Sequence, residues 1–316
     1  MNIYKLDNIN ELVSHGTAVT VGMFDGVHIG HRHILSMLSR MASESGLSPV
    51  VVTFDRHPRQ VLTNDVSTRF RITTNEERYA LLEQCGVAYV VEVHFTPQLA
   101  SMSACEFFSQ VLVQQLHVKA LVLGYDNVFG SRSHNDFDQL PDLAAQMGVK
   151  VYVDTAVSLN DIDVSSTQVR NALHRGDVAT ASAMLGRFYR LWGSVERGRQ
   201  VGRKIGFPTA NVSLNDPTKV LPAEGVYAVR VTLSDGTSGL MGMANIGGQP
   251  TFGLEKPVFE VNIFDFDSDI YDTTLTVDFV SRLRSIVRFD SVDALIGQLK
   301  TDRDAARQLL SQYSNQ

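Results

Sequence analysis

One short stretch carries the strongest structural signal in the first half of the chain. It reads Val19-Thr20-Val21-Gly22-Met23-Phe24-Asp25-Gly26-Val27-His28-Ile29-Gly30-His31. An apolar, β-branched run over 18–21 ends in a glycine-bracketed turn. Apolar side chains then recur at helical spacing at Ile34, Leu35, Met37 and Leu38. The stretch therefore predicts a strand, a tight turn and a helix, with two histidines at the helix N-terminus.

His28 and His31 are three residues apart, so both imidazoles are expected to point the same way from the start of this helix. Free backbone N–H groups and the helix dipole attract phosphate there, and Gly26 and Gly30 remove side chains that would hold a phosphate away. Two imidazoles aimed at the α-phosphate of a nucleotide stabilise the charge that develops as it is attacked. The pattern HxGH therefore predicts nucleotidyl transfer, and it differs from both GxGxxG and GxxxxGK[ST].

Two other interpretations of these histidines are available. One is a surface helix start with ordinary polar residues. The other is a zinc cluster that includes His33, but no cysteine or fourth ligand lies at a metal-like spacing nearby. The phosphate site is the favoured interpretation.

Composition limits the class of protein. The chain has 316 residues, of which 44% are hydrophobic, and this suits two globular domains, each with its own core. A net charge of -6 argues against nucleic acid as the main partner, because phosphate backbones require a basic face, and it favours small-molecule substrates. The sequence leaves the oligomeric state open.

The cysteines and the N-terminus indicate the compartment. Cys85 and Cys105 fall in apparently helical segments, which predicts buried thiols in a reducing environment rather than disulfides. The first ten residues contain no apolar signal core, and no run of about eighteen apolar residues occurs, so no membrane partner is expected. The expected location is the cytoplasm.

Residues 1–186 are predicted to form an α/β, Rossmann-like domain. Short β-branched runs alternate with amphipathic stretches, a pattern typical of a parallel sheet with helices on both faces. The predicted strands are 17–22, 49–54, 88–93, 120–124 and 149–153, and the predicted helices lie near 31–45, 75–85, 103–117 and 137–147. Ligands bind at the carboxyl ends of such strands, so the loops 22–31, 54–59 and 124–130 are expected to face one crevice.

The segment 163–170 opens a further helix with hydroxyl side chains. Ser165, Ser166 and Thr167 suit either plain helix capping or contact with a phosphate, and the hydroxyls alone do not distinguish the two. The positive charge of Arg170 favours the phosphate contact.

Residues 187–316 are predicted to form a small antiparallel barrel. Six short alternating runs, separated by Gly and Pro and without intervening helices, indicate this architecture. The predicted strands are 189–196, 210–214, 226–233, 240–246, 258–264 and 275–280. Apolar residues at helical spacing over 291–310 predict a terminal helix that packs against the barrel.

The run 198–211 spaces glycines every four residues around three positive side chains, among them Lys204. Such a flexible basic flap suits a nucleotide triphosphate, and the Thr209 hydroxyl and the Asn211 carbonyl are hard oxygen ligands for Mg²⁺. An isolated run of this kind is more often a hairpin with a solvated basic turn.

Glu260 is the candidate base for attack by a hydroxyl on a γ-phosphate. Phe259, Val261 and Ile263 alternate with it, so Glu260 and Asn262 are expected on the opposite face of the strand, which is either a substrate mouth or plain solvent. The acidic run of Asp265, Asp267 and Asp269 is interpreted as a solvated turn, because it lacks the Gly and terminal Glu of a calcium loop.

With both halves in view, the chain resembles the bacterial bifunctional riboflavin kinase/FMN adenylyltransferase (FAD synthetase) family over nearly its whole length. The motifs that carry the resemblance are 22–31, 53–58, Ser165-Ser166-Thr167, Gly206-Phe207-Pro208-Thr209-Ala210-Asn211, Gly225-Val226-Tyr227 and Asn245-Ile246-Gly247. The resemblance implies two reactions: riboflavin plus ATP gives FMN and ADP, and FMN plus ATP gives FAD and pyrophosphate.

The resemblance also implies roles for single residues. His28 and His31 would bind and polarise the ATP phosphates, and Glu260 would accept the proton of the ribityl 5′-hydroxyl. Mg²⁺-ATP in the kinase would be held by Thr209 and Asn211. The other implied nucleotide-binding residues are Gly22, Phe24, Asp25, Gly26, Asp126, Ser165, Thr167, Arg170 and Lys204.

The chain departs from the family pattern at several of these positions. Asn127 and Val128 follow the loop aspartate where Phe-Arg is usual, and Gln168 replaces a frequent Arg. In the kinase half, Asn262 replaces a frequent His, and Asp272 stands where Gly is usual. Both activities are expected to persist because the phosphate and base positions are intact.

Two rival functions belong to other classes. His28-Ile29-Gly30-His31 spells the HIGH signature of class I aminoacyl-tRNA synthetases, but the chain shows neither a KMSKS-like loop nor a basic RNA-binding surface. A non-catalytic flavin or nucleotide sensor would bind flavin without ATP turnover. The intact candidate catalytic residues count against the sensor.

Overall fold

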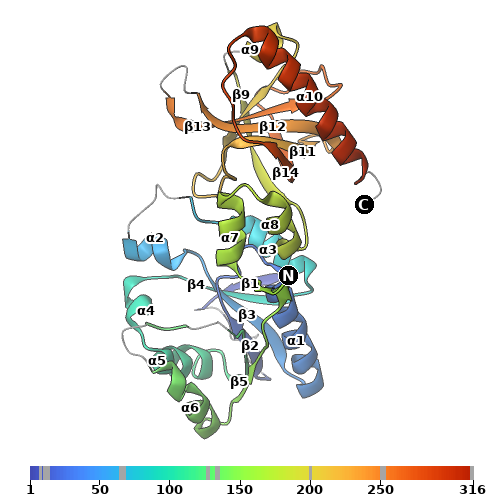
Figure 1. Ribbon diagram of the computed structural model, residues 1–316. Helices are drawn as coiled ribbons and strands as arrows, with labels where there is room; N and C mark the ends of the chain where they lie inside the picture. The colour runs from blue at the N-terminus through green and yellow to red at the C-terminus, as the bar shows by residue number, and fades with distance from the viewer. Residues whose placement is uncertain are drawn as a thin grey trace. The chain divides into compact units, whose positions relative to one another are not determined.

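The computed structural model describes residues 1–6, 9, 15–63, 69–125, 129–131, 136–198, 201–249 and 254–313 (Figure 1). The chain divides into two compact units, Met1–Ser166 and Thr167–Gln316. The predicted positions Asp126, Asn127 and Val128 lie outside the described residues.

The first unit is built on a six-stranded parallel sheet with the order β1-β4-β3-β2-β5-β6. Its strands are β1 (Asn2–Lys5), β2 (Thr17–Val21), β3 (Ser48–Phe54), β4 (Tyr89–Val93), β5 (Val118–Leu123) and β6 (Lys150–Val153). The central strand β2 is buried along its whole length, as β-branched runs in parallel sheets usually are. The prediction of a parallel sheet is confirmed, and β1 is an additional edge strand.

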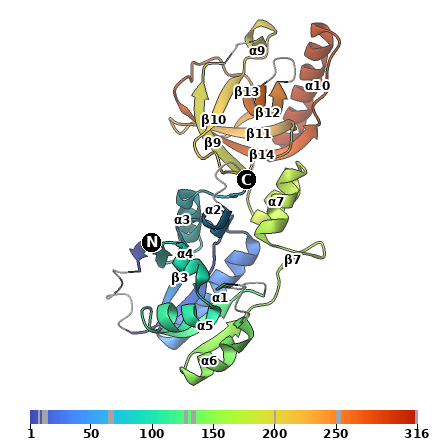
Figure 2. The same cartoon turned by 90° about the vertical axis from the view of Figure 1, so that its left-hand side faces the viewer.

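Helices cover both faces of this sheet (Figures 1 and 2). On one face, side chains of α1 (Ile29–Ser45) and α3 (Asn75–Gln84) pack on alternate residues of β2, β3, β4 and β5. The opposite face packs against α5 (Ala104–Phe107), the π-helical η1 (Phe108–Val113) and α6 (Leu140–Gln146). The remaining elements are α2 (Pro58–Thr63), α4 (Pro97–Ser101), η2 (Phe137–Gln139), and the short hairpin β7 (Ser158–Leu159) and β8 (Ile162–Asp163).

The strand order decides which loops are neighbours. β2 lies between β3 and β5, and all of these strands are parallel, so the segments that follow them leave the same edge of the sheet. The connection reverses direction between β2 and β5, the type of switch point at which α/β sheets bind ligands. The segment 22–31 follows β2 at this point.

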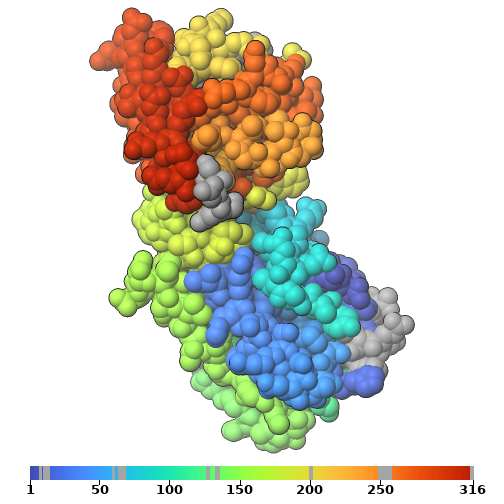
Figure 3. Space-filling model, turned by 90° about the vertical axis from the view of Figure 1, so that its right-hand side faces the viewer, coloured from blue at the N-terminus to red at the C-terminus, as the bar shows by residue number. Residues whose placement is uncertain are grey.

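The second unit is a closed antiparallel barrel with the order β10-β13-β12-β11-β14-β9. Its strands are β9 (Tyr189–Glu196), β10 (Ala210–Leu214), β11 (Gly225–Leu233), β12 (Leu240–Gln249), β13 (Leu254–Ile263) and β14 (Thr274–Arg284). A one-turn helix, α9 (Val201–Lys204), interrupts the basic flap. The terminal helix α10 (Val292–Ser311) packs through Ala306 and Leu310 on the outer barrel face, where Figure 3 shows it in red against the orange strands. The predicted barrel and terminal helix are confirmed.

The helices α7 (Ser166–His174) and α8 (Val178–Leu185) precede the barrel. Within the second unit, α8 packs on β9 and β14, and the Ala223 N–H donates to the Leu173 carbonyl of α7 at 2.9 Å. The division between the compact units, at 166/167, therefore lies twenty residues before the predicted domain boundary at 186/187. That functional boundary stays a prediction. Across the described part of the chain, no helix combines the length and apolarity needed to cross a membrane.

Candidate active sites

The two histidines of the HxGH motif lie side by side at the start of α1. The His28 and His31 rings are stacked, with centroids 3.6 Å apart, and His28 caps the helix because its Nδ1 accepts from the His31 N–H at 3.3 Å. The Phe24 ring lies 5.0 Å from the His31 ring. Burial, and second the neighbouring His28, lower the pKa of His31 well below 6.5. This shift favours the neutral form of the His31 imidazole.

The turn before these histidines has an unusual backbone. Phe24 and Val27 have φ angles of 50° and 38°, a region that side chains other than glycine rarely adopt, and Val27 is fully buried. A Cβ on Gly30 would lie 3.2 Å from His28 Nδ1 and 3.5 Å from the Val164 carbonyl oxygen. Such strain persists only where surrounding contacts hold the turn, and it is typical of ligand-binding sites.

Asp25 supplies some of those contacts. Its carboxylate is buried and accepts hydrogen bonds from the Ile72 and Thr73 N–H groups, both at 3.0 Å. The Gly26 N–H donates in turn to the Thr73 hydroxyl at 3.0 Å. This geometry makes Asp25 a support of the turn, and its direct contact with a nucleotide stays a prediction.

The residues of the 163–170 segment fall on both sides of the division between the units. Within the first unit, the Ser166 hydroxyl donates to the Asp25 carbonyl at 2.8 Å, which ties the segment to the HxGH turn. Within the second unit, Arg170 Nη2 donates to the Thr167 hydroxyl at 3.4 Å. The roles predicted for Ser165, Thr167 and Arg170 toward ATP stay predictions.

His33 lies apart from this pair. Its Nε2 is 3.3 Å from Asp154 Oδ1 at the end of β6. Among the described residues, no group of three or more His, Cys, Asp and Glu side chains is arranged to hold a metal ion.

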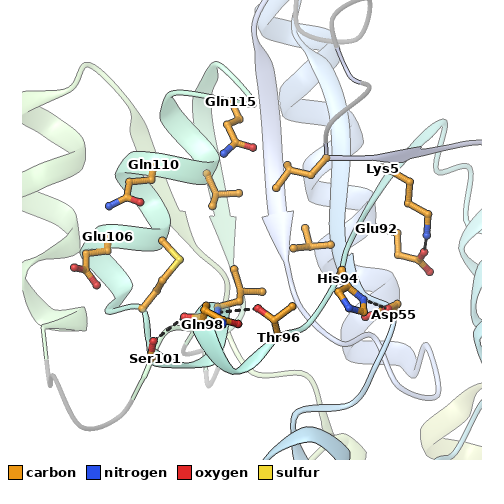
Figure 4. A pocket seen from close by; sticks show the side chains of 15 residues that line it. Lys5, Asp55, Glu92, His94, Thr96, Gln98, Ser101, Glu106, Gln110 and Gln115 are labelled. Carbon is orange, nitrogen blue, oxygen red and sulfur yellow. Dashed lines mark hydrogen bonds and ion pairs between the residues drawn. The ribbon is translucent and has the colours of Figure 1, made fainter.

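An open cavity of about 1130 Å³ lies in the first unit beside the carboxyl ends of β3 and β4 (Figure 4). Asp55 and His94 are hydrogen-bonded at its edge, with Nδ1 and Oδ2 2.6 Å apart. Burial alone would raise the pKa of Asp55, but hydrogen bonds from the Phe95 N–H and from His94 outweigh it and lower that pKa. Val93, Leu99, Met102 and Val111 form the apolar wall. The loop 54–59 was predicted to face a ligand crevice, whereas no sequence pattern indicated His94 or this wall.

In the barrel unit, strand register assembles the second candidate site. Asn211 of β10 and Asn245 of β12 both lie directly opposite Glu260 of β13. Directly opposite residues of an antiparallel pair point to the same face, so the three polar side chains form one row. The alternating Phe259 and Val261 are buried in the interior, which places Glu260 on the outer face. Burial raises the pKa of Glu260, and a hydrogen bond with Asn245 opposes that rise.

The glycines of the basic flap let its backbone approach this row closely. A Cβ on Gly198 would collide with the Asn211 side chain, and one on Gly202 would collide with the Phe207 carbonyl and lie 3.4 Å from the Thr209 hydroxyl. The Asn262 amide donates to the Pro208 carbonyl at 2.6 Å and holds the turn before Thr209. Asn262 thus has a local structural task. Lys204 is exposed at the end of α9.

Beside Thr209 the barrel carries two adjoining cavities. The larger, about 560 Å³, is lined by Arg197, Arg203, Pro208, Asp267, Asp269 and Tyr271, and the smaller by Thr209 together with part of the same set. The Arg197 guanidinium lies over the Tyr271 ring at 4.8 Å. Asp267 and Asp269 are exposed, as expected for a solvated turn, and they also line these cavities.

Comparison with known proteins covers both units. The family model for FAD synthetase matches residues 11–168, and the model for riboflavin kinase matches residues 185–310. The bifunctional riboflavin kinase/FMN adenylyltransferase of Haemophilus influenzae is 36% identical over 96% of this chain and 97% of its own. The relative of the same name from Pseudomonas fluorescens is 40% identical over 93% of each chain. This chain belongs to that bifunctional family.

The family resemblance inferred from the motifs is therefore confirmed, and neither the aminoacyl-tRNA synthetase nor the sensor interpretation is favoured. A solved structure from Streptococcus pneumoniae, described as a macrolide-efflux protein, matches 97% of this chain and 99% of its own with a TM-score of 0.85 and 34% identity. The family's FAD synthetase and riboflavin kinase models leave residues 169–184, most of α7 and α8, between them.

Proposed function

We propose that this chain phosphorylates riboflavin to FMN at the barrel site and adenylylates FMN to FAD at the HxGH site, with one ATP for each step. Membership in the bifunctional family supports both activities. The observation that carries the assignment of sites is that each unit gathers its own set of residues: stacked imidazoles at a helix start in one, and a carboxylate between two asparagines in the other.

For adenylyl transfer, the triphosphate of ATP lies at the N-terminus of α1 with its α-phosphate at His28 and His31. A phosphate oxygen of FMN attacks the α-phosphorus, and the bond to the β-phosphate oxygen breaks to release pyrophosphate. The nucleophile is already ionised, so the step needs no base. The negative charge of the nucleotide favours protonation of His31, and the helix N–H groups and imidazoles stabilise the developing charge.

The cavity of Figure 4 is the proposed place for the flavin ring of FMN, because it combines an apolar wall with polar edges in the same unit. It adjoins β4, and β4 lies two strands from β2. At a strand spacing of about 4.8 Å this separation is about 10 Å, which the ribityl chain of FMN can bridge. The phosphate of FMN then reaches the HxGH turn.

For the kinase, Glu260 accepts the proton of the ribityl 5′-hydroxyl as that oxygen attacks the γ-phosphorus of ATP and ADP leaves. A carboxylate whose pKa is raised is a stronger base than an ordinary glutamate and is better matched to this task. Asn245 orients the carboxylate by the hydrogen bond between them.

The kinase residues fit a magnesium ion. The Thr209 hydroxyl and the Asn211 carbonyl are hard oxygen donors, and the glycine backbone around them leaves room for phosphate oxygens. When bound, Mg²⁺ neutralises charge on the transferring phosphates. Lys204, Arg197 and Arg203 supply further positive charge near the Thr209 cavities. The cytoplasmic location and the lack of nucleic-acid and membrane partners stay predictions from the sequence.

Product analysis tests this function. Purified protein is mixed with riboflavin, Mg²⁺ and ATP, and the flavins are separated by chromatography over time. The expected result is FMN followed by FAD, with ADP and pyrophosphate as co-products. Flavin binding without ATP turnover would contradict the proposal and would support a sensor.

A further inference from the structure

Arg78 is a buried charge that neither reaction uses directly. It lies in the first turn of α3, and its side chain is 2% exposed, the largest of the fully buried side chains among the described residues. Burial is the main cause that lowers its pKa, yet a guanidinium remains charged in proteins. A buried charge is costly unless it is hydrogen-bonded, so the partners of this guanidinium indicate what it does.

The guanidinium joins two loops at the carboxyl edge of the sheet. Nη1 donates to the Met23 carbonyl at 3.1 Å, and Nη2 donates to the Phe54 carbonyl at 2.8 Å. Met23 directly precedes the strained Phe24 and opens the turn that leads to His28. Phe54 is the last residue of β3 and directly precedes Asp55 at the edge of the flavin cavity. Arg78 thus spans the two parts of the adenylylation site.

Neighbouring residues on the same segment make parallel connections. The backbone at Thr73 holds the Asp25 carboxylate, and the Asn75 amide donates to the Asp55 carbonyl at 2.9 Å. The segment 72–78 therefore contacts both loops at several points, and Arg78 alone contacts both with one side chain. The N–H groups of a guanidinium are fixed in one rigid plane. A guanidinium that bonds to two carbonyls at once therefore fixes the distance between them, which two separate side chains do not.

We propose that Arg78 is a positioning residue for adenylyl transfer, which fixes the HxGH turn relative to the end of β3 and so aligns the phosphate of FMN with the α-phosphate of ATP. This inference rests on the proposed function of the HxGH site. Arg78 touches neither substrate, and it acts through the Met23 and Phe54 carbonyls. A misplacement of about 1 Å in such an alignment can cost about 100-fold in rate.

The test compares Arg78→Met, Arg78→Lys and the matched control Tyr79→Phe in the full-length chain. Tyr79 is the next residue on α3 and accepts a bond from Arg78, and its hydroxyl donates to Glu92, but it contacts neither loop through the bonds described. We measure kcat and KM for FAD formation from supplied FMN, kinase activity as an internal reference in the same molecule, and the thermal unfolding midpoint.

The expected result is that Arg78→Met lowers kcat for FAD formation by about 100-fold while KM for ATP changes by less than about threefold, because alignment rather than binding is lost. Arg78→Lys retains the charge but lacks the rigid two-nitrogen fork, so it recovers less than about tenfold of that loss. Kinase activity of all variants and FAD formation by Tyr79→Phe stay at the wild-type level.

The inference is overturned if Arg78→Met forms FAD at the wild-type kcat, or if Tyr79→Phe loses as much as Arg78→Met. It is also overturned if the lysine variant forms FAD at the wild-type kcat, because the positive charge without the fork would then be sufficient. Where Arg78→Met does not fold, Arg78→Gln replaces it with the same expected loss. Failure of the wild-type protein to form FAD from FMN and ATP would refute the proposed function instead, so the two failures are distinguishable.

Discussion

The two proposed nucleotide sites of this chain differ in the chemical groups that they gather. At the HxGH site, two imidazoles are stacked against each other at a helix N-terminus, and burial lowers the pKa of His31. At the barrel site, Glu260 lies between Asn211 and Asn245 on an outer strand face, and burial raises the pKa of its carboxylate. The nucleophiles explain the difference: the phosphate of FMN arrives ionised and needs electropositive groups already in place, whereas the hydroxyl of riboflavin needs a base.

The largest expected effect concerns the base. Glu260→Gln should lower FMN formation by about 1,000-fold, within the range of general-base catalysis, and leave adenylylation of supplied FMN unchanged. Chromatography of the flavin products measures both rates. Asp278→Asn, which removes a barrel carboxylate paired with Arg190 away from the row, is the control and should retain both activities. Loss of both activities in Glu260→Gln would reject the separation of the sites.

A substitution of His31 tests the HxGH site. His31→Gln should lower FAD formation by about 100-fold, because a group that stabilises developing charge is removed, and should spare the kinase. His33→Gln is the matched control on the same helix, since His33 pairs with Asp154 instead of His28. Equal losses in the two variants would show that helix integrity, and not the imidazole at position 31, determines the rate.

The lowered pKa of His31 also predicts a pH dependence of stability. The pKa of His31 is lower in the folded state than its ordinary value of 6.5, so the unfolded chain binds the extra proton first. The free energy of unfolding should therefore fall as pH drops below about 6.5, by at most about 1.4 kcal/mol per pH unit from this residue, and stay level above it.

Thermal or urea unfolding of the wild type and of His31→Gln between pH 5 and pH 8 measures this contribution. The variant should show a smaller loss at low pH. An equal slope in both proteins would mean that His31 titrates normally in the folded state.

The smallest effect concerns a turn of the barrel unit. Asp272 has a φ angle of 60°, in the left-handed region where glycine is favoured. Asp272→Gly should raise the free energy of unfolding by about 1 kcal/mol, and Asp272→Ala should lower it, because alanine has no polar side chain to offset the strain. Chemical denaturation of the two variants checks the order, and a glycine variant no more stable than wild type would contradict it.

Local patterns were sufficient to predict most of the architecture. The strands β2 to β6 and the barrel strands were visible because their β-branched or alternating runs end at Gly, Pro or helix-start signals. The strand β1 was missed because only Ile3 and Tyr4 mark it, and its pairing with β4 is non-local. The helical segment near 103–117 was expected, but its division into α5 and the π-helical η1 was not.

The sites depend more on non-local contacts. The motif predicted the histidine pair, since both residues lie in one turn of helix. Nothing in the sequence placed Asn245 beside Glu260, because strand register brings them together, nor showed that Asp267 and Asp269 line a cavity. From the sequence, Arg78 is indistinguishable from an ordinary polar residue of a helix. Its hydrogen bonds join it to Met23 and Phe54, which lie 55 and 24 residues away in the chain.

Complementation between two variants, each defective in one of the two reactions, shows whether the two sites work independently. Glu260→Gln and His31→Gln proteins are each incubated with riboflavin, Mg²⁺ and ATP, separately and as a mixture, and FAD is measured. The account predicts little FAD from either variant alone and restored FAD in the mixture, where one protein makes FMN and the other converts it. A mixture that makes no more FAD than the separate variants would contradict the account.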